Sequence, residues 1–252
     1  MDLRLSGRRV LVTGGTRGIG RAIVEAFLGE GAAVAFCARA ADEVAATEEA
    51  MGERGTAVGS VVDVGDGAAL AAWVERSAEV LGGLDVVVAN VSALAIPDTE
   101  ENWLTSLNVD LMHTVRLVRA AMPHLERSDA ASIIAISSVS GRESDAVSGP
   151  YGTAKSAIVG YIHGLAVQLA GRGIRANTVS PGNTYFAHGF WAGIEANDPE
   201  LFGSAMALNP TGRMGTAEEV AAPVVFLASP LASRVSGTNL VVDGALTRGI
   251  QL

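Results

Sequence analysis

The chain has 252 residues, a formal net charge of −9 at pH 7, an apolar fraction of 49% and one cysteine, Cys37. This length suits one large domain, and the acidic balance argues against nucleic acid as a partner, since binding phosphates requires clustered Lys and Arg. A single cysteine excludes an internal disulfide and a multi-cysteine zinc site, and no metal is expected. No apolar run reaches the ~18 residues of a membrane span, and no signal peptide is readable, so we expect a cytoplasmic protein without membrane association.

Short β-branched runs alternate along the chain with longer Ala-rich segments of helical composition. Runs that are apolar on both faces are typical of parallel strands covered by helices on each side, so the alternation predicts an α/β fold with a doubly wound parallel sheet of seven strands. No linker divides the chain, and we predict one domain over residues 1–252. The predicted strands are Arg9–Thr13, Ala33–Ala38, Ala57–Val62, Leu84–Ala89, Ser132–Ser137, Ile174–Val179 and Asn239–Val242. The predicted helices include Gly20–Gly29, Asp42–Arg54, Gly67–Leu81 and Tyr151–Arg172.

A glycine-rich turn follows the first predicted strand and opens a helix. Its glycines allow a tight turn and a close approach of the backbone to a pyrophosphate, which the free N–H groups of the helix N-terminus attract. An ordinary turn is the alternative, but the position between a strand and a helix favours a dinucleotide site. The residues of the turn predicted to bind the cofactor are Gly14, Thr16, Arg17, Gly18, Ile19 and Gly20.

The ends of the next three strands indicate which dinucleotide is bound. Many NAD sites end the second strand with a carboxylate for the ribose hydroxyls, but here Ala38 is followed by Arg39. Arg39, together with Arg17 of the turn, is suited to the 2′-phosphate of NADP(H), although both arginines could be solvated surface charges. Asp63 and Val64 follow the third strand, where Asp63 would meet the adenine or serve only as a turn residue. Asn90 follows the fourth strand and is predicted to lie beneath the cofactor.

A tyrosine and a lysine four residues apart follow the fifth predicted strand. At this spacing Tyr151 and Lys155 share one face of a helix. A free tyrosine ionises near pH 10, and a neighbouring ammonium favours its phenolate, so the pair can transfer protons near neutral pH. Ser138, at the end of the fifth strand, would hydrogen-bond the substrate oxygen. The Tyr-Lys spacing alone is common in helices by chance. Its position after the glycine turn and just downstream of Ser138 favours the catalytic interpretation.

Together these motifs resemble the short-chain dehydrogenase/reductase family, in its single-domain form of about 250 residues, over nearly the whole chain. The resemblance implies a Rossmann fold and a catalytic set in which Asn108 supports a proton-relay water next to the lysine. It places Pro181, Gly182 and Thr184 beside the nicotinamide and implies a homotetramer. The segments that carry the resemblance are residues 13–20, 107–109, 151–155, 177–182, 213–220 and 242–244.

The chain also departs from the family pattern. The usual Asn-Asn-Ala-Gly segment is Ala89-Asn90-Val91-Ser92, and Phe186 stands where the family often has a threonine hydroxyl. Residues 184–210 are predicted to form a lid over the substrate, because four aromatic residues fall between Tyr185 and Trp191. A plain hydrophobic anchor for a helix pair is the alternative. The predicted substrate residues are Ser140, Arg142, Phe186 and Trp191.

Two functions remain open at this point. The first is an NADP(H)-dependent oxidoreductase that acts on a small ketone or secondary alcohol, with 3-oxoacyl compounds as the default suggested by the resemblance to 3-oxoacyl-carrier-protein reductases. The second is a cofactor-binding regulatory protein of the same fold without turnover, since a fold alone does not prove activity.

Overall fold

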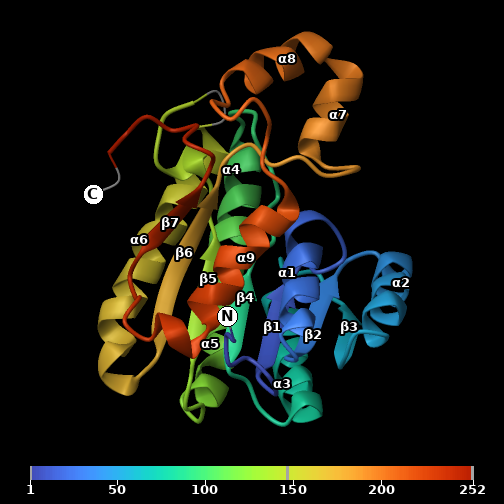
Figure 1. Cartoon of the computed structure of the whole chain (residues 1–252), viewed down its shortest axis with the longest axis vertical. Helices are drawn as coiled ribbons and strands as arrows, with labels where there is room; N and C mark the ends of the chain where they lie inside the picture. The colour runs from blue at the N-terminus through green and yellow to red at the C-terminus, as the bar shows by residue number, and fades with distance from the viewer. Residues whose placement is uncertain (1, 146–147, 251–252) are drawn as a thin grey trace.

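The computed structural model of the chain describes residues 2–145 and 148–250. Seven parallel strands form one sheet in the order β3-β2-β1-β4-β5-β6-β7 (Figure 1). The predicted fold class is confirmed, and each predicted strand end lies within two residues of the observed one. The strands are β1 (Arg9–Thr13), β2 (Ala33–Ala38), β3 (Ala57–Val61), β4 (Val86–Ala89), β5 (Ser132–Ile136), β6 (Arg175–Pro181) and β7 (Asn239–Val242).

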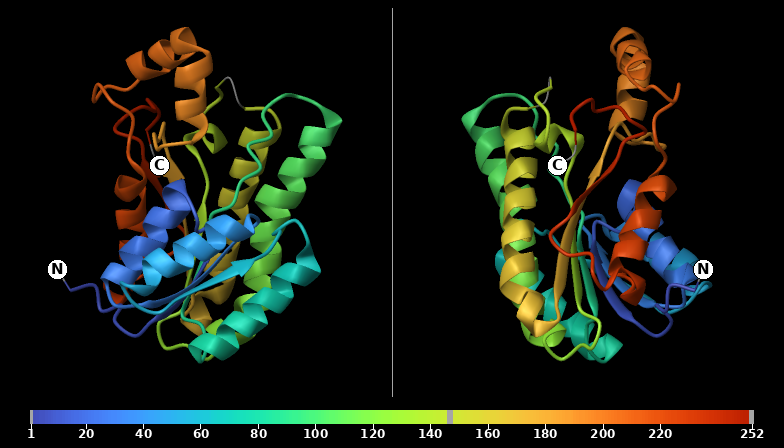
Figure 2. Two further views of the ribbon diagram at one scale, coloured as in Figure 1. Left: turned by 90° about the vertical axis from the view of Figure 1, so that its right-hand side faces the viewer. Right: turned by 60° about the vertical axis from the view of Figure 1, so that its left-hand side comes forward.

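Helices cover both faces of this sheet (Figure 2). Buried side chains of α1, α2 and α9 pack on one face, and those of α3, α5 and α6 pack on the other. The helices are α1 (Gly18–Gly29), α2 (Ala41–Gly52), α3 (Gly67–Leu81), α4 (Glu100–Ser106), α5 (His113–Leu125), α6 (Pro150–Leu169), α7 (Phe190–Asn197), α8 (Pro199–Ala207) and α9 (Ala217–Ala228). Among the described residues, no helix is long and apolar enough to cross a membrane.

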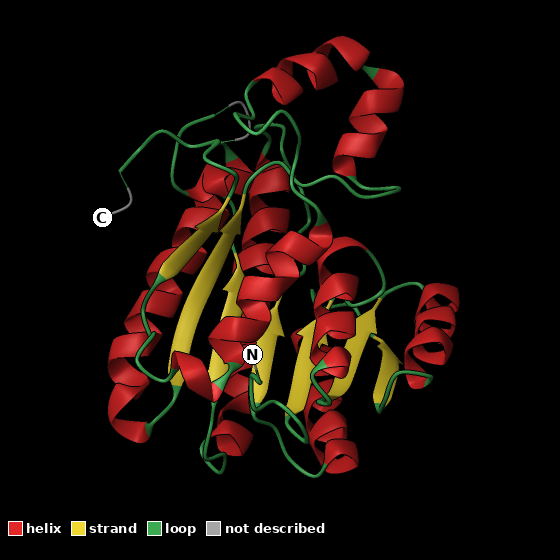
Figure 3. Cartoon of the chain, in the orientation of Figure 1, coloured by secondary structure: helices red, strands yellow, loops and turns green. Residues whose placement is uncertain are grey.

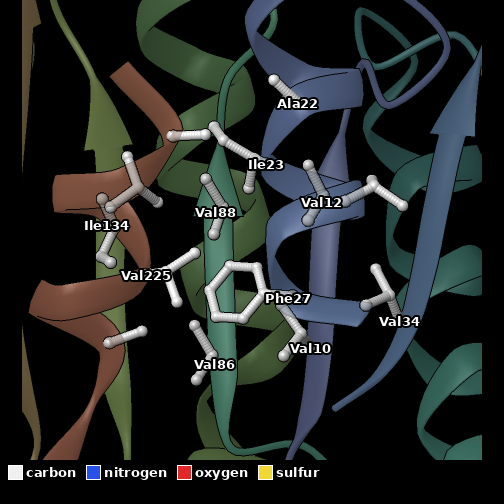
Figure 4. Close-up of a cluster of buried hydrophobic side chains, with 14 of the residues drawn as sticks. Val10, Val12, Ala22, Ile23, Phe27, Val34, Val86, Val88, Ile134 and Val225 are labelled. Atoms are coloured by element: carbon white, nitrogen blue, oxygen red, sulfur yellow. The ribbon is translucent and has the colours of Figure 1, made fainter. Parts of the chain in front are cut away.

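Alternate residues of each strand supply the two cores. On β1, Val10 and Val12 face the α1 and α9 side, whereas Leu11 faces the α3 and α5 side. Figure 4 shows the first of these cores, in which Phe27 of α1 lies among valines of β1 and β4. Because every central strand is buried on both faces, its sequence reads as a continuous apolar run rather than an alternation.

The helix that carries α4 and α5 contains an irregular turn. A π-helical segment, Leu107–Met112, joins α4 to α5, so the two form one continuous helix. A π turn contains more residues than an α turn, and it therefore changes which side chains face the sheet.

The functional side chains lie at the carboxyl edge of the sheet. In Figure 3 the arrowheads of the strands point toward the loops at the top, where α7 and α8 stand above the strand ends. Ligands of doubly wound sheets bind at this edge. The predicted segment 184–210 contains α7 and α8 and therefore lies on the same side as the glycine turn.

Candidate active site

The glycine turn is held between β2 and β4 by backbone and amide hydrogen bonds. The N–H groups of Gly14 and Gly15 donate to the carbonyl of Cys37 at 2.8 and 3.1 Å. Asn90 Nδ2 donates to the carbonyls of Thr13 and Gly14 at 3.0 and 3.3 Å. Asn90 thus anchors the turn through its side-chain amide, and its place beneath the cofactor stays a prediction.

Two glycines of the turn are required by geometry. Gly18 has a φ of +53°, and a Cβ on Gly20 would lie 2.0 Å from the carbonyl oxygen of Gly14. Helix α1 begins at Gly18 with no side-chain cap and no acidic residue in its first turn. Its free N–H groups can therefore bind an anion such as a pyrophosphate.

The two arginines predicted to read the cofactor are exposed at the edge of this turn. Within the described part of the chain, neither the Arg17 nor the Arg39 side chain makes a hydrogen bond or ion pair, so both guanidinium groups are available to a phosphate. One carboxylate lies nearby, because Thr16 Oγ1 donates to Glu43 Oε2 at 2.9 Å. At the end of β3, Asp63 is exposed and accepts from the N–H of Gly65 at 2.9 Å, and Val64 is buried.

Strand β5 and helix α6 bring the three predicted catalytic side chains to the carboxyl edge. Ser138 is buried, its Oγ accepts from the N–H of Ser140 at 3.2 Å, and no described residue accepts its hydroxyl proton. Lys155 Nζ lies 5.6 Å from the ring centroid of Tyr151. The same ammonium donates to the carbonyl of Ile136 at 3.1 Å, so the end of β5 fixes the lysine.

The structure corrects the position expected for the fourth residue of the set. Asn108 Oδ1 accepts from Arg116 Nη1 at 2.7 Å, and Asn108 Nδ2 donates to the carbonyl of Gly65 at 3.2 Å. The side chain beside the lysine is instead Asp110, whose Oδ1 lies 3.3 Å from Lys155 Nζ. Asn108 and Asp110 lie two residues apart in the π turn and therefore point to different sides of the helix, so they do not both face the lysine.

A sequence signal for Asp110 exists. From Asp110 onward most buried positions follow the helical spacing i, i+3, i+4, i+7, i+8, and the buried Ser106 lies four residues before Asp110. A carboxylate on a buried stripe requires a cation or hydrogen-bond donors beside it, because burying an isolated charge costs free energy of folding. The members of the stripe are Asp110, His113, Thr114, Leu117, Val118, Ala121 and Leu125.

His113 connects the glycine turn with this cluster. It is fully buried, and burial, followed by the charge of Lys155, lowers the pKa of its imidazole to about 4. The neutral ring lies 3.1 Å from the carbonyl of Val109 through Nδ1 and 3.0 Å from Thr13 Oγ1 through Nε2. Nδ1–H therefore donates to the carbonyl, and Nε2 accepts from the hydroxyl.

The residues predicted to contact the nicotinamide and the substrate lie at the end of β6, in the segment 184–210 and in the loop after β5. Pro181 ends β6, and Thr184 Oγ1 donates to the carbonyl of Gly182 at 3.1 Å. A Cβ on Gly18 would lie 2.5 Å from the Phe186 ring, so this ring packs against the glycine turn. Trp191 packs edge-on against Phe190, with ring centroids 5.3 Å apart.

In the loop after β5, Ser140 Oγ donates to Asp145 Oδ2 at 2.5 Å, and Arg142 is exposed. Contact of Ser140, Arg142, Phe186 and Trp191 with a substrate stays a prediction. No group of three or more metal-ligating side chains occurs among the residues that the structure describes.

Comparison with known proteins identifies the family. The family model described as enoyl-(acyl carrier protein) reductase matches residues 14–247, which include the glycine turn and the Tyr151–Lys155 pair. The chain belongs to the short-chain dehydrogenase/reductase family. A curated short-chain relative, isoepoxydon dehydrogenase patN of Penicillium expansum, is 43% identical over 98% of this chain and 97% of its own length. The 3-oxoacyl-[acyl-carrier-protein] reductase FabG of Vibrio harveyi is 32% identical over 97% of this chain and 99% of its own.

Solved structures of the short-chain dehydrogenase/reductase family superpose over nearly the full chain. A short-chain dehydrogenase from Burkholderia cenocepacia J2315 in complex with NADP has a TM-score of 0.83 at 32% identity and covers 96% of this chain and 99% of its own. An NADPH-bound short-chain oxidoreductase from Pseudomonas aeruginosa PAO1, described as containing an atypical catalytic center, has a TM-score of 0.88 at 30% identity and covers 97% and 99%.

Proposed function

We propose that the chain is an NADP(H)-dependent oxidoreductase that interconverts a small ketone and a secondary alcohol. The observation that carries the proposal is the convergence of Ser138, Tyr151 and Lys155 at the carboxyl edge of the sheet, with the ammonium 5.6 Å from the phenol ring. Support for the cofactor comes from the uncapped N-terminus of α1, from the exposed Arg17 and Arg39, and from the NADP and NADPH complexes of similar proteins.

The bound nicotinamide would supply or accept the hydride. The protein residues manage the proton and the substrate oxygen. Ser138 donates its free hydroxyl proton to that oxygen, which holds the carbonyl and stabilises charge on it. Tyr151 gives a proton to the oxygen in reduction and takes it back in oxidation. Lys155, anchored by the carbonyl of Ile136, favours the phenolate and can bind the cofactor ribose with its remaining protons.

For the substrate, we propose a free small carbonyl compound rather than one attached to an acidic carrier protein. A net charge of −9 offers an acidic partner little attraction. The relatives named above act, by their names, on both classes. Following NADPH oxidation at 340 nm with cyclic ketones and with 3-oxoacyl thioesters tests the proposal. Tight NADPH binding without turnover on any carbonyl would instead favour the regulatory function.

The cofactor preference is the first testable expectation. We expect NADPH to bind at least about tenfold more tightly than NADH, because Arg17 and Arg39 can each form a charge-assisted hydrogen bond to the 2′-phosphate. Glu43, held near the turn by Thr16, opposes part of this attraction. The double substitution Ala38→Asp and Arg39→Leu should reverse the preference, because a carboxylate repels the phosphate and accepts from the ribose hydroxyls. Fluorescence titration with both cofactors measures the two ratios.

A matched control distinguishes recognition from general charge. Arg21 lies on α1 close to the turn, but its guanidinium is engaged by Glu25 at 3.0 Å. Arg21→Leu should therefore leave the ratio of the two affinities unchanged. Equal affinities of the wild type for NADPH and NADH, or a double variant that still prefers NADPH, would refute the assignment of Arg39.

We further propose a cytoplasmic homotetramer whose subunits pair through α4, α5 and α6. The supporting observation is a set of exposed apolar and small positions on α4 and α6: Leu104 and Val167 are 63% and 71% exposed. Space for a Cβ is open at Gly160 and Gly164, so the surface of α6 permits a close approach. Light scattering at micromolar concentration should give four times the chain mass, and a monomer would contradict the assembly. Cell fractionation tests the location.

A further inference from the structure

A buried carboxylate faces the proposed catalytic lysine. Asp110 is 0% exposed and Lys155 is 2% exposed, and Asp110 Oδ1 lies 3.3 Å from Lys155 Nζ. Asp110 Oδ2 accepts from the N–H of Ala93 at 3.1 Å. Asp110 Oδ1 accepts no hydrogen bond from the described part of the chain, so the ammonium is its stabilising neighbour. The two charges therefore form an ion pair shielded from solvent.

Among the charged and titratable groups around Asp110, Lys155 is the cation that balances its carboxylate. From α5, His113 is neutral because its pKa lies near 4, and the guanidinium of Arg116 is bound to Asn108 and to the carbonyl of Gly65. From α6, Lys155 and the phenol of Tyr151 face the site. Strand β5 contributes the carbonyl of Ile136, which accepts from Lys155 Nζ. The Asp110 carboxylate is thus stabilised by the Lys155 ammonium. In turn, the carboxylate reduces the electrostatic field of the ammonium at Tyr151.

This arrangement has a consequence for the tyrosine. An ammonium beside a phenol stabilises the phenolate in proportion to its net field, and a carboxylate on its other side reduces that field. With a neutral side chain at the same position, the full charge of the ammonium would act on the phenol, and the proton would leave at a lower pH. A tyrosine that keeps its proton near neutral pH is suited to donate it to a carbonyl oxygen.

We propose that Asp110 is a positioning residue that holds Lys155 and weakens its pull on the Tyr151 proton, which favours the direction of carbonyl reduction at neutral pH. The role in reduction rests on the proposed function, whereas the electrostatic effect can be measured without turnover. Asp110 acts through Lys155 and need not touch the substrate.

The test is a spectrophotometric titration of the tyrosines at 295 nm, where tyrosinate absorbs. The chain has three tyrosines. The pKa of Tyr161 is raised by burial, and that of Tyr185 is raised chiefly by its hydrogen bond to Glu195, so both ionise late. Subtracting the titration of a Tyr151→Phe protein isolates Tyr151. Asp110→Asn, compared with Asp110→Asn/Tyr151→Phe, should lower the midpoint of this difference curve by about 0.5 pH unit or more.

Controls decide each outcome. Asp129→Asn removes an exposed carboxylate that pairs with Arg8, and it should leave the midpoint unchanged. If Asp110→Asn does not fold, Asp110→Ser supplies the same loss of charge in a smaller side chain. A midpoint that stays constant or rises in a folded neutral variant overturns the proposal. When a ketone is found, the pH profile of kcat should move in the same direction.

The inference and the proposed function can fail separately. Wild-type protein that oxidises NADPH with a ketone but shows no shift on Asp110→Asn refutes the role of Asp110 alone. A shift of the midpoint in a protein without turnover on any carbonyl refutes the proposed oxidoreductase and the role in reduction, and it leaves the effect of Asp110 on Tyr151 standing.

Discussion

Replacing Tyr151 by phenylalanine is expected to reduce kcat by about 10²–10⁴-fold, the usual contribution of a general acid or base, with little change in NADPH affinity. The substitution removes only the phenolic hydroxyl and keeps the ring beside Lys155. The uncapped N-terminus of α1 and the two arginines, which we propose bind the cofactor, remain in place. Steady-state rates at 340 nm and fluorescence titration with NADPH measure the two effects.

Tyr161 provides the matched control on the same helix. It is half-buried on α6 and packs against the core formed with α3 and α5. Tyr161→Phe removes a hydroxyl of the same kind and should leave kcat within about twofold, since no acid–base role falls to it. A Tyr151→Phe protein that keeps more than about a tenth of the wild-type rate would disprove the assignment of Tyr151 as the general acid–base.

Lys155→Met is expected to lower the free energy of unfolding by about 3–5 kcal/mol, because it leaves the fully buried Asp110 without a cation. Methionine fills a similar volume, so packing loss contributes little. Adding Asp110→Asn in the same protein should recover most of the loss, since the pair is then replaced by two neutral side chains. Urea denaturation at pH 7 without cofactor measures both steps.

Comparing Lys155→Met with the double variant also distinguishes the loss of packing from the effect of the unpaired charge on stability. If the double variant is as unstable as Lys155→Met alone, the loss arises from the lost lysine contacts, including the hydrogen bond to the carbonyl of Ile136, and not from an unpaired carboxylate. All variants should remain inactive, because each lacks the ammonium beside Tyr151. Recovery of stability without recovery of rate would thus show that the two roles of Lys155 are distinct.

The fold was predictable because its signals are local. Each central strand is a short apolar run, and each functional turn directly follows a strand, as with Gly14–Gly20 after β1 and Ser138 after β5. The spacing of Tyr151 and Lys155 on one helix required no tertiary information. These features follow from backbone periodicity and from turn chemistry, which act over a few residues.

Asn108 was placed beside Lys155 because its residue type matches the family pattern, whereas the structure has Asp110 there. The helical spacing of the buried positions, which includes Asp110 and excludes Asn108, determines which side chain faces the sheet. The contact of Phe186 with Gly18 and the hydrogen bond between His113 and Thr13 join residues far apart in the chain. Such contacts follow from the folded structure and not from short sequence patterns.

The order of the strands places the proposed phosphate-recognition residues and the proposed proton-transfer residues at different parts of the sheet edge. The residues proposed to recognise the nucleotide phosphate follow β1 and β2, and those proposed for proton transfer follow β5. Strands β2 and β5 are three strand spacings apart, about 14 Å. Energetic effects at sites this far apart generally add. Evolution or design could therefore exchange the cofactor by changes near Ala38 and Arg39 and keep the proton chemistry inherited with Tyr151.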